Sequence, residues 1–294
     1  MKELAPICLF TYNRFDETKQ TVEALQKNFL AKESDLIIFS DGAKNDKVLE
    51  KILKIRKYLK TIDGFKSVKI YESPTNQGLA TSIINGVSQV IKKYKKVVVL
   101  EDDLITSPNF LNFINQALSF YKEKKDVFSI SGYTMDLRSL NNYEKDYYLG
   151  LRASSWGWGI WIDRWGNVDW SVEDYDNFKW NLMSQYRFMK GGSDLPHMLR
   201  KQMNKKIDSW AIRWCYYQFK NNLLTVFASK SKIVSIGFGP EATHTKKTDR
   251  FETKLDDGSK RIFEFDEELI RNKKLEKEFR NKFSMLNRLK NKLL

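Results

Sequence analysis

The stretch Lys95–Leu104, KKVVVLEDDL, decides the fold, because a short β-branched run ends there in three consecutive carboxylates. Val97–Leu100 is too short and too β-branched for a helix, and it predicts a buried parallel strand. Glu101, Asp102 and Asp103 then lie at the carboxyl end of that strand, where open α/β sheets bind ligands. Crowded carboxylates repel one another unless a cation neutralises them, so the stretch predicts a phosphate site that depends on Mn2+ or Mg2+.

A second interpretation of the same acids stays open at this point. Ser107 and Pro108 are typical of a helix cap and a first helical turn. Carboxylates near that turn would interact favourably with the helix dipole. On this interpretation the acids only begin the next helix and bind no ligand.

Upstream of the acids, a short apolar strand is followed by an amphipathic helix three times. We expect strands over 5–9, 35–42 and 68–71, the second of them ending in a polar turn. We expect helices over 16–30, 47–59 and about 76–94, the last opened by residues 76–80. With the strand before the acids, these units predict an α/β fold whose mostly parallel, twisted sheet has helices on both faces. Polar residues cluster where each strand ends, so the site should lie at that edge.

Composition and charge narrow the class of protein. The chain has 294 residues, 41% of them hydrophobic and 14% aromatic, which is enough for one large α/β domain with an appendage. No run approaches the ~20 apolar residues of a membrane span, and the first residues lack the apolar core of a signal peptide, so we expect a cytoplasmic protein. Cys8 and Cys215 give neither a disulfide framework nor a zinc pattern. The net charge of +14 predicts attraction to polyanions, such as nucleotide phosphates, nucleic acid or anionic lipid.

An aromatic run, Ser154–Trp161 or SSWGWGIW, follows the predicted strands. Its glycines let tryptophan rings and backbone crowd together, as a platform for a sugar or a base requires. A core strand with turns is the alternative interpretation.

Residues 263–294 predict a basic amphipathic helix at the carboxyl terminus. Apolar residues recur along one stripe of it: Leu275, Phe279, Phe283, Leu286, Leu289 and Leu293. Such a helix could dock on an anionic membrane surface. Alternatively, the stripe could pack on the domain and leave the lysines in solvent.

Taken in order, these motifs resemble the GT-A fold nucleotide-sugar glycosyltransferases. Pro6–Arg14, PICLFTYNR, is similar to that family's first strand and nucleotide loop, and Ser40–Gly42 is similar to its base-binding turn. Leu100–Leu104, followed by Ser107–Phe110, resembles the acidic metal motif of the N-acetylglucosaminyltransferase of N-glycan processing. Bacterial capsule and lipopolysaccharide sugar transferases share this layout. The resemblance implies a nucleotide-sugar-binding half over 1–132, an acceptor-binding and catalytic half of the same domain over 133–262, and the terminal helix.

The resemblance also implies roles for the acids. Asp103 would bind Mn2+ or Mg2+ directly, while Glu101 and Asp102 would contact sugar or ribose hydroxyls. His244, in the loop GPEATH that follows a predicted strand, would be a further ligand of the metal or the diphosphate.

For the nucleotide sugar, the resemblance implies contacts from Thr11, Asn13, Arg14, Asp41, Asn76 and Gly78. Arg14 would pair with the diphosphate, and Asp41 would accept the imide hydrogen of uracil. Trp156, Trp158 and Trp210 would supply apolar faces for the donor or acceptor sugar.

Asp208 is the residue that we predict as the base of an inverting transfer. Such a reaction needs a carboxylate that takes the proton of the acceptor hydroxyl while its oxygen attacks the anomeric carbon. In Ile207–Trp214, IDSWAIRW, Asp208 precedes a helix, where the similar enzymes place an acid between tryptophans. Asp194 and Glu241 are competing candidates, and Asp208 could instead be only a helix cap.

The leading hypothesis is a metal-dependent transferase that moves a hexose or N-acetylhexosamine from a UDP-sugar to a saccharide acceptor, carried on a lipid, in bacterial surface polysaccharide synthesis. It would be cytoplasmic or peripheral on the inner face of the plasma membrane. A sugar-phosphate nucleotidyltransferase is the second hypothesis, although residues 11–14 lack the glycines of its phosphate loop. A polyanion-binding protein is the third. The acids at the expected site argue against it, so we expect no nucleic-acid partner.

Overall fold

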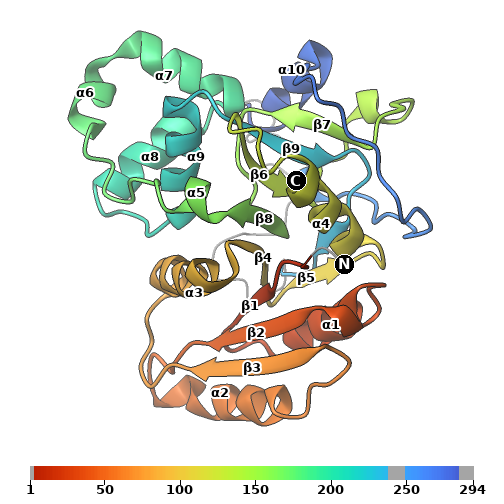
Figure 1. Ribbon diagram of the computed structural model, residues 1–294. Helices are drawn as coiled ribbons and strands as arrows, with labels where there is room; N and C mark the ends of the chain where they lie inside the picture. The colour runs from red at the N-terminus through yellow and green to blue at the C-terminus, as the bar shows by residue number, and fades with distance from the viewer. Residues whose placement is uncertain (1–2, 238–248, 285–294) are drawn as a thin grey trace.

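Residues 3–237 and 249–284 are described by the computed structural model of the chain. Eight strands form its main sheet: β1 (Ile7–Thr11), β2 (Asp35–Ser40), β3 (Ser67–Glu72), β4 (Lys96–Glu101), β6 (Val127–Ser131), β7 (Tyr147–Gly150), β8 (Trp158–Trp161) and β9 (Leu224–Ala228). Their order across the sheet is β3-β2-β1-β4-β8-β6-β9-β7 (Figure 1). The strands expected near the amino terminus are confirmed, with β1 displaced by two residues toward the carboxyl side.

The sheet is mostly parallel, as the sequence predicts. Strands β3, β2, β1 and β4 pair in parallel, and β6 pairs in parallel with β9. Strand β8 joins the two groups because it is antiparallel to both β4 and β6, and β7 is antiparallel to β9 at the edge. Six strands therefore run in one direction, and their carboxyl ends meet at one edge of the sheet.

Ten α-helices lie within the described ranges: α1 (Phe15–Gln26), α2 (Asp46–Leu59), α3 (Leu79–Tyr94), α4 (Phe110–Phe120), α5 (Ile162–Trp165), α6 (Tyr175–Trp180), α7 (Leu182–Phe188), α8 (Leu195–Met203), α9 (Trp210–Lys220) and α10 (Lys273–Lys282). Successive residues of a strand point to opposite faces, so each face has its own hydrophobic core. In β1, Ile7 and Leu9 join the core under α1, α2, α4 and α10, whereas Cys8 and Phe10 join the core under α3 and α5–α9. Helices on both faces are thus confirmed, and Figure 1 shows α6–α9 gathered away from α1 and α2.

A second, two-stranded sheet follows the acids directly. Strand β5 (Leu104–Thr106) pairs antiparallel with β10 (Ile233–Ser235). The next helix, α4, begins only at Phe110, after Asn109. The acids therefore end a strand and do not begin a helix, so the second interpretation of this stretch is wrong.

The carboxyl-terminal segment differs from its prediction. Among the described residues from 263 onward, only Lys273–Lys282 is α-helical. Leu275, Phe279 and Phe283 are buried in the core on the face that α1 covers, so this part of the apolar stripe packs on the domain. Leu286, Leu289 and Leu293 lie outside the described residues. No helix in the described ranges has the length and apolar content needed to cross a membrane.

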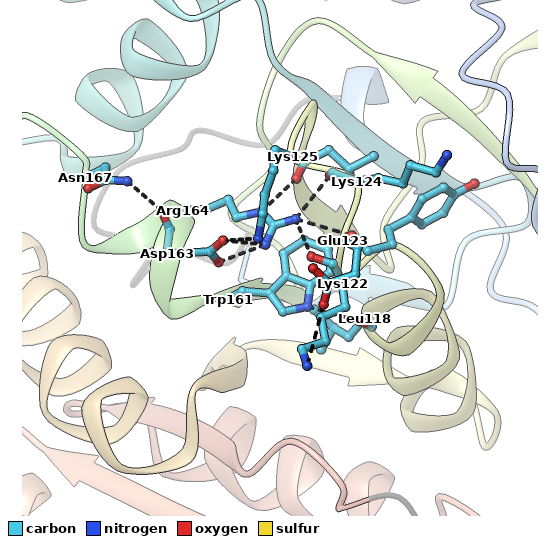
Figure 2. A network of polar contacts seen from close by, with 11 residues as sticks. Leu118, Lys122, Glu123, Lys124, Lys125, Trp161, Asp163, Arg164 and Asn167 are labelled. Atoms are coloured by element: carbon cyan, nitrogen blue, oxygen red, sulfur yellow. Dashed lines mark hydrogen bonds and ion pairs between the residues drawn. The ribbon is translucent and has the colours of Figure 1, made fainter.

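A polar network closes the sheet at the edge opposite the acids (Figure 2). Trp161 of β8 pairs with Lys96, the first residue of β4, and Arg164 follows one helical turn later. The buried Arg164 guanidinium donates to the carbonyls of residues 121, 122, 124 and 127, and to both Asp163 oxygens at 2.8 and 2.9 Å. It also lies over the Trp161 ring, whose Nε1 donates to the Leu118 carbonyl. Arg164 thereby satisfies carbonyls of the turn that follows α4, Trp161 satisfies one in the last turn of α4, and both bonds fix this region to β8.

Candidate active site

The acids of the opening stretch meet the loop after β1. Phe10 is level with Glu101 in the pairing of β1 with β4, so the residues that follow both strands are neighbours. Arg14 Nη2 donates to Asp102 Oδ1 at 2.5 Å, and its Nη1 donates to Asp103 Oδ2 at 2.9 Å. The backbone N–H of Tyr12 donates to Asp102 Oδ2 at 3.0 Å. The structure therefore brings together Arg14, Asp102 and Asp103, which the sequence had placed in one site.

A buried threonine of α1, Thr21, forms hydrogen bonds with the backbone of the turn that contains Asp102 and Asp103. The Thr21 hydroxyl donates to the Asp102 carbonyl at 2.9 Å and accepts from the Leu104 N–H at 3.1 Å. Both bonds fix the backbone that carries Asp102 and Asp103. Sequence reasoning missed Thr21, and its only signal is a hydroxyl on the apolar face of a predicted helix.

The site has more negative than positive charge. Burial, together with the charges of Asp103 and Asp102, raises the pKa of Glu101 to about 8, although Arg14 opposes this shift. Burial also raises the pKa of Asp102 to about 6, again against Arg14. One guanidinium thus faces three carboxyl groups, and protons or a cation must supply the remaining compensation.

This set of oxygens fits a divalent ion that a substrate helps to hold. Carboxylate oxygens suit Mg2+ and Mn2+. Asp103 is the more accessible acid, because 16% of its side chain is exposed against 4% for Asp102. Within the described ranges, no three Asp, Glu, His or Cys side chains are placed to hold an ion by themselves. One or two carboxylates completed by phosphate oxygens is a common way of binding Mg2+.

Gly237 lies directly on the metal-binding candidate. It follows β10, whose next residue, Ile236, donates its N–H to the Asp103 carbonyl at 2.9 Å. A Cβ at Gly237 would overlap the Asp103 carboxylate and crowd Arg14. Only glycine therefore fits here without displacing these two side chains. The sequence shows the glycine, but the long-range contact that requires it is visible only in the fold.

Asp41 organises the loop that precedes α3. Its Oδ1 accepts from the N–H groups of Gly42 and Gln77, both at 2.8 Å. Its Oδ2 accepts from Asn76 Nδ2 at 3.0 Å and from the Gly78 N–H at 3.1 Å. The predicted residues Asp41, Asn76 and Gly78 thus form one cluster, and Gln77 is a member that sequence reasoning missed. A carboxylate offers about four acceptor positions, so a uracil contact requires one of these bonds to exchange.

The other predicted residues of the nucleotide loop lie at the end of β1. Thr11 is buried, and within the described part of the chain its hydroxyl has no hydrogen-bond partner. Asn13 is half-buried beside it. A buried hydroxyl without a partner is costly, so Thr11 is suited to a polar ligand. His244 and the competing base Glu241 lie outside the described residues.

The predicted role of Trp158 as a sugar platform is wrong. Trp158 is 1% exposed, and its ring packs against Trp165, Trp210 and Trp214 at centroid distances of 5.5, 5.4 and 4.5 Å. Trp210 is buried in the same cluster and is wrong for the same reason. These rings form the core between β8 and α9 and offer no face to a ligand.

Trp156 has a different position, because it is half-buried and lines a cavity of about 260 Å³. Aromatic side chains dominate the lining: Tyr133, Trp156, Phe227, Phe251, Phe279 and Phe283. Arg152, Ser154 and Ser155 add polar groups. The Tyr133 and Trp156 rings are in edge contact at 4.6 Å, beside the carboxyl end of β6. An aromatic cavity with few polar groups is typical of a small-molecule site.

The structure separates the candidate bases. Asp194 lines no open surface, since both of its oxygens accept from Arg152, at 2.8 and 3.2 Å, and it is buried. The Asp208 side chain is 67% exposed, with Arg213 at 3.6 Å. Ser209, not Asp208, caps α9, because its hydroxyl accepts from the Ile212 N–H. The interpretation of Asp208 as a cap is therefore wrong.

Packing connects Asp208 to the strand-end edge. Trp210, two residues further on, packs against Trp158. Trp158 pairs with Val99 of β4, two residues before Glu101. The start of α9 is thereby held at the edge of the sheet where the acids lie, and Asp208 directly precedes its cap with an exposed carboxylate.

Comparisons with known proteins agree with this architecture. A family model described as Glycosyl transferase family 2 matches residues 7–167. This span contains Arg14, Asp41 and the three acids. It selects a glycosyltransferase over the nucleotidyltransferase and polyanion-binding hypotheses.

Three solved structures resemble the chain at low sequence identity. A mannosyltransferase from Pyrobaculum calidifontis, in complex with GDP-Man and Mn2+, has a TM-score of 0.42 and 10% identity, covering 75% of this chain and 70% of that one. Residues 1–349 of S. aureus TarS have a TM-score of 0.41 and 10% identity, covering 79% of this chain and 60% of theirs. The galactosyltransferase LgtC, in complex with donor and acceptor sugar analogs, has a TM-score of 0.40 and 11% identity, covering 74% and 72%.

A search of curated proteins finds no match. The assignment therefore depends on the family model, which covers more than half of the chain, and on the sheet that it spans. The expected GT-A architecture, with a mostly parallel sheet between helical layers, is confirmed. The chain belongs to glycosyl transferase family 2.

Proposed function

We propose that this glycosyltransferase transfers a hexose or N-acetylhexosamine from a UDP-sugar to a saccharide acceptor carried on a lipid, in bacterial surface polysaccharide synthesis. The observation that supports this best is the cluster of Glu101, Asp102 and Asp103 around Arg14, at the edge where six strands end. Nucleotide ligands of open α/β sheets bind at such an edge.

The donor half of the proposal rests on the residues around that cluster. Arg14 is within reach of a diphosphate that approaches Asp103, and its guanidinium can bind two phosphate oxygens at once. The Asp41 cluster would border the nucleoside, and the unpartnered Thr11 hydroxyl would bind a polar group of the donor. These contacts suit a nucleotide diphosphate, and UDP is the one that we propose.

Asp103 is the proposed metal ligand, with Asp102 and Glu101 beside it. When bound, Mn2+ or Mg2+ would supply positive charge to the leaving diphosphate. Tyr12, Thr21 and Gly237 serve this site by fixing the acids: two donate or accept hydrogen bonds, and one leaves room for the Asp103 carboxylate. The role of His244 as a further ligand stays a prediction.

On the acceptor side, the proposed step is a single displacement. The acceptor oxygen forms a bond to the anomeric carbon as the bond from that carbon to the diphosphate breaks, and Asp208 takes the hydroxyl proton. The cavity beside Trp156 would hold the acceptor sugar or the first part of its lipid. Its aromatic faces suit both, since sugar rings and isoprenoid chains present C–H surfaces.

The test is calorimetric titration of UDP into the purified chain, with Mn2+ and then with EDTA. We expect binding with Mn2+ and none with EDTA. A panel of UDP-sugars in the same buffer should then show slow hydrolysis of the preferred donor. Binding of UDP that is unaffected by EDTA would contradict the metal assignment, and binding of another nucleotide in place of UDP would contradict the proposed donor.

A further inference from the structure

Helices α6 and α7 belong to the helical group at one end of the molecule (Figure 1), and four residues within 180–186 of these helices have strongly exposed apolar side chains. Trp180 is 81% exposed, Leu182 78%, and Met183 and Tyr186 61% each. We call these four residues the apolar tip. All eight tryptophans lie in the described ranges, and Trp180 is the one whose ring is exposed. Apolar residues gathered in this way mark an interaction surface.

The apolar tip is not needed to hold the two helices together. Phe178 of α6 and Phe188 of α7 are buried, and their rings meet at 5.8 Å. Leu182 and Tyr186 are four residues apart and share the opposite face of α7, with Met183 next to it. Asn181, at the corner between the helices, accepts from the Ser184 N–H at 2.9 Å and so caps α7. Helix α7 therefore has a packed apolar face and a second, uncovered one.

The charges around the apolar tip indicate what covers it. Lys179, Arg187 and Lys190 are exposed beside it, and residues 175–206 contain seven Lys or Arg but only two Asp. Asp176 is paired with Lys179 at 2.6 Å, and Asp194 is buried on Arg152. An apolar surface bordered by cations complements an anionic bilayer, where chains take the apolar groups and headgroup phosphates take the cations.

We propose that the apolar tip inserts into the headgroup region of an anionic lipid bilayer, with Arg187 and Lys190 against the lipid phosphates. Trp180 and Tyr186 belong to the residue types that settle at this depth. The proposed docking site is thus on α6 and α7 and not on α10, whose apolar side chains Leu275 and Phe279 are buried. Helix α8 follows this region, and its Leu195 and Met198 line the aromatic cavity. The helical group α6–α8 would then contact the bilayer through α6 and α7 and line the cavity through α8.

The test uses the full chain without nucleotide, so its outcome is independent of the proposed reaction. The chain is sedimented with vesicles of phosphatidylcholine and phosphatidylglycerol, and with vesicles of phosphatidylcholine alone. We expect binding to the anionic vesicles and about tenfold weaker partition for the variant Trp180→Ser/Leu182→Ser/Met183→Ser. Brominated lipid should quench Trp180 fluorescence in the wild type, and Trp180→Phe should bind as well but lose most of the quenching.

A matched control comes from two exposed isoleucines away from the apolar tip. Ile262 and Ile270 are 77% and 65% exposed and lie outside α6 and α7, so Ile262→Ser/Ile270→Ser should bind vesicles as the wild type does. Thermal unfolding followed by circular dichroism shows that each variant is folded. Equal binding by the tip variant and the wild type, or no binding of the wild type to anionic vesicles, overturns the proposal. The proposal is also overturned if the wild type and the isoleucine control self-associate in a concentration-dependent way and the tip variant does not. The apolar tip would then bind a second copy of the chain.

Discussion

Two arginines, one buried and one partly exposed, lie near opposite ends of strand β4, and their partners differ in kind. Arg164 binds four backbone carbonyls and the single carboxylate of Asp163, and 4% of its side chain is exposed. Arg14 binds two carboxylates, with a third beside them, and 15% of its side chain is exposed. The first set of hydrogen bonds is complete within the fold. The second leaves negative charge that a ligand can neutralise, so one cluster holds the structure and the other is arranged for binding.

The largest expected effect is on turnover, and it comes from Asp208, the proposed base at the edge of the sheet where Arg14 lies. Asp208→Asn removes the proposed base but keeps the shape of the side chain. We expect kcat to fall by about 10²–10⁴-fold, as it does when a positioned base is lost. UDP affinity and melting temperature should stay unchanged, because the Asp208 side chain is 67% exposed and its ion pair with Arg213 is 3.6 Å long. Steady-state kinetics with the preferred UDP-sugar measures this, and full activity would place the base elsewhere.

The next effect separates the two clusters directly. Asp103→Ala removes the proposed metal ligand, and we expect Mn2+-dependent UDP binding to weaken by about 100-fold or more, since outer partners of a metal site alone are worth about 10–100-fold. Asp163→Ala is the matched control, because it removes a carboxylate from the Arg164 network. Calorimetry should show normal UDP binding for that control. Loss of binding in both variants, or in neither, would end the distinction between the clusters.

A mutation in the Arg164 network should lower the stability of the fold and leave UDP binding unchanged. Arg164→Ala leaves Asp163 and the backbone carbonyls of the turn after α4 without their shared donor. We expect the free energy of unfolding to fall by about 2–4 kcal/mol. Arg164→Lys should recover only part of it, because one ammonium cannot reach several carbonyls at once. Chemical unfolding measures the change. A variant with unchanged stability but impaired UDP binding would reverse the roles of the two arginines.

Much of the donor side could be predicted because it depends on local pattern. The alternation of short strands and helices gives the sheet, and parallel strand ends bring Arg14 near Asp102 without further information. Thr21 and Gly237 could not be found in the same way. Each matters through contacts with residues more than 80 positions away, and no sequence period reports such a contact.

The two amphipathic surfaces show a second limit of the sequence. The stripe of α10 and the outward face of α7 both consist of apolar residues at helical spacing. Periodicity identifies the apolar face but not what lies against it. Tertiary packing covers Leu275 and Phe279, whereas Leu182 and Tyr186 stay exposed. The same limit explains why the sequence could not separate Trp156 from Trp158. The two are only two residues apart, but Trp156 lines a cavity and Trp158 lies in the core.

The smallest effect is a difference in pH dependence between the edges. Burial and neighbouring acids raise the pKa of Glu101, so the folded chain holds a proton that the unfolded chain releases. The contribution of Glu101 to the free energy of unfolding is therefore fully present below about pH 4 and is lost as pH rises toward 8. At the other edge burial raises the pKa of Asp163, but Lys125 and Arg164 outweigh it, and the net pKa is lowered. The contribution of Asp163 to the free energy of unfolding is therefore present at neutral pH and is lost as pH falls below the ordinary pKa of an aspartate.

Melting temperatures in EDTA across pH 3 to 9, at constant ionic strength, test this opposition, because Asp163 titrates at the acidic end of that range and Glu101 above it. Glu101→Gln should flatten the decline of stability toward high pH, because the amide cannot ionise. Mn2+ with UDP should raise the melting temperature more at pH 8 than at pH 6, since Asp102 and Glu101 are then more fully ionised and attract the cation. An identical pH profile for Glu101→Gln and the wild type would mean that the charge at the strand-end cluster is already balanced within the fold, as it is around Arg164.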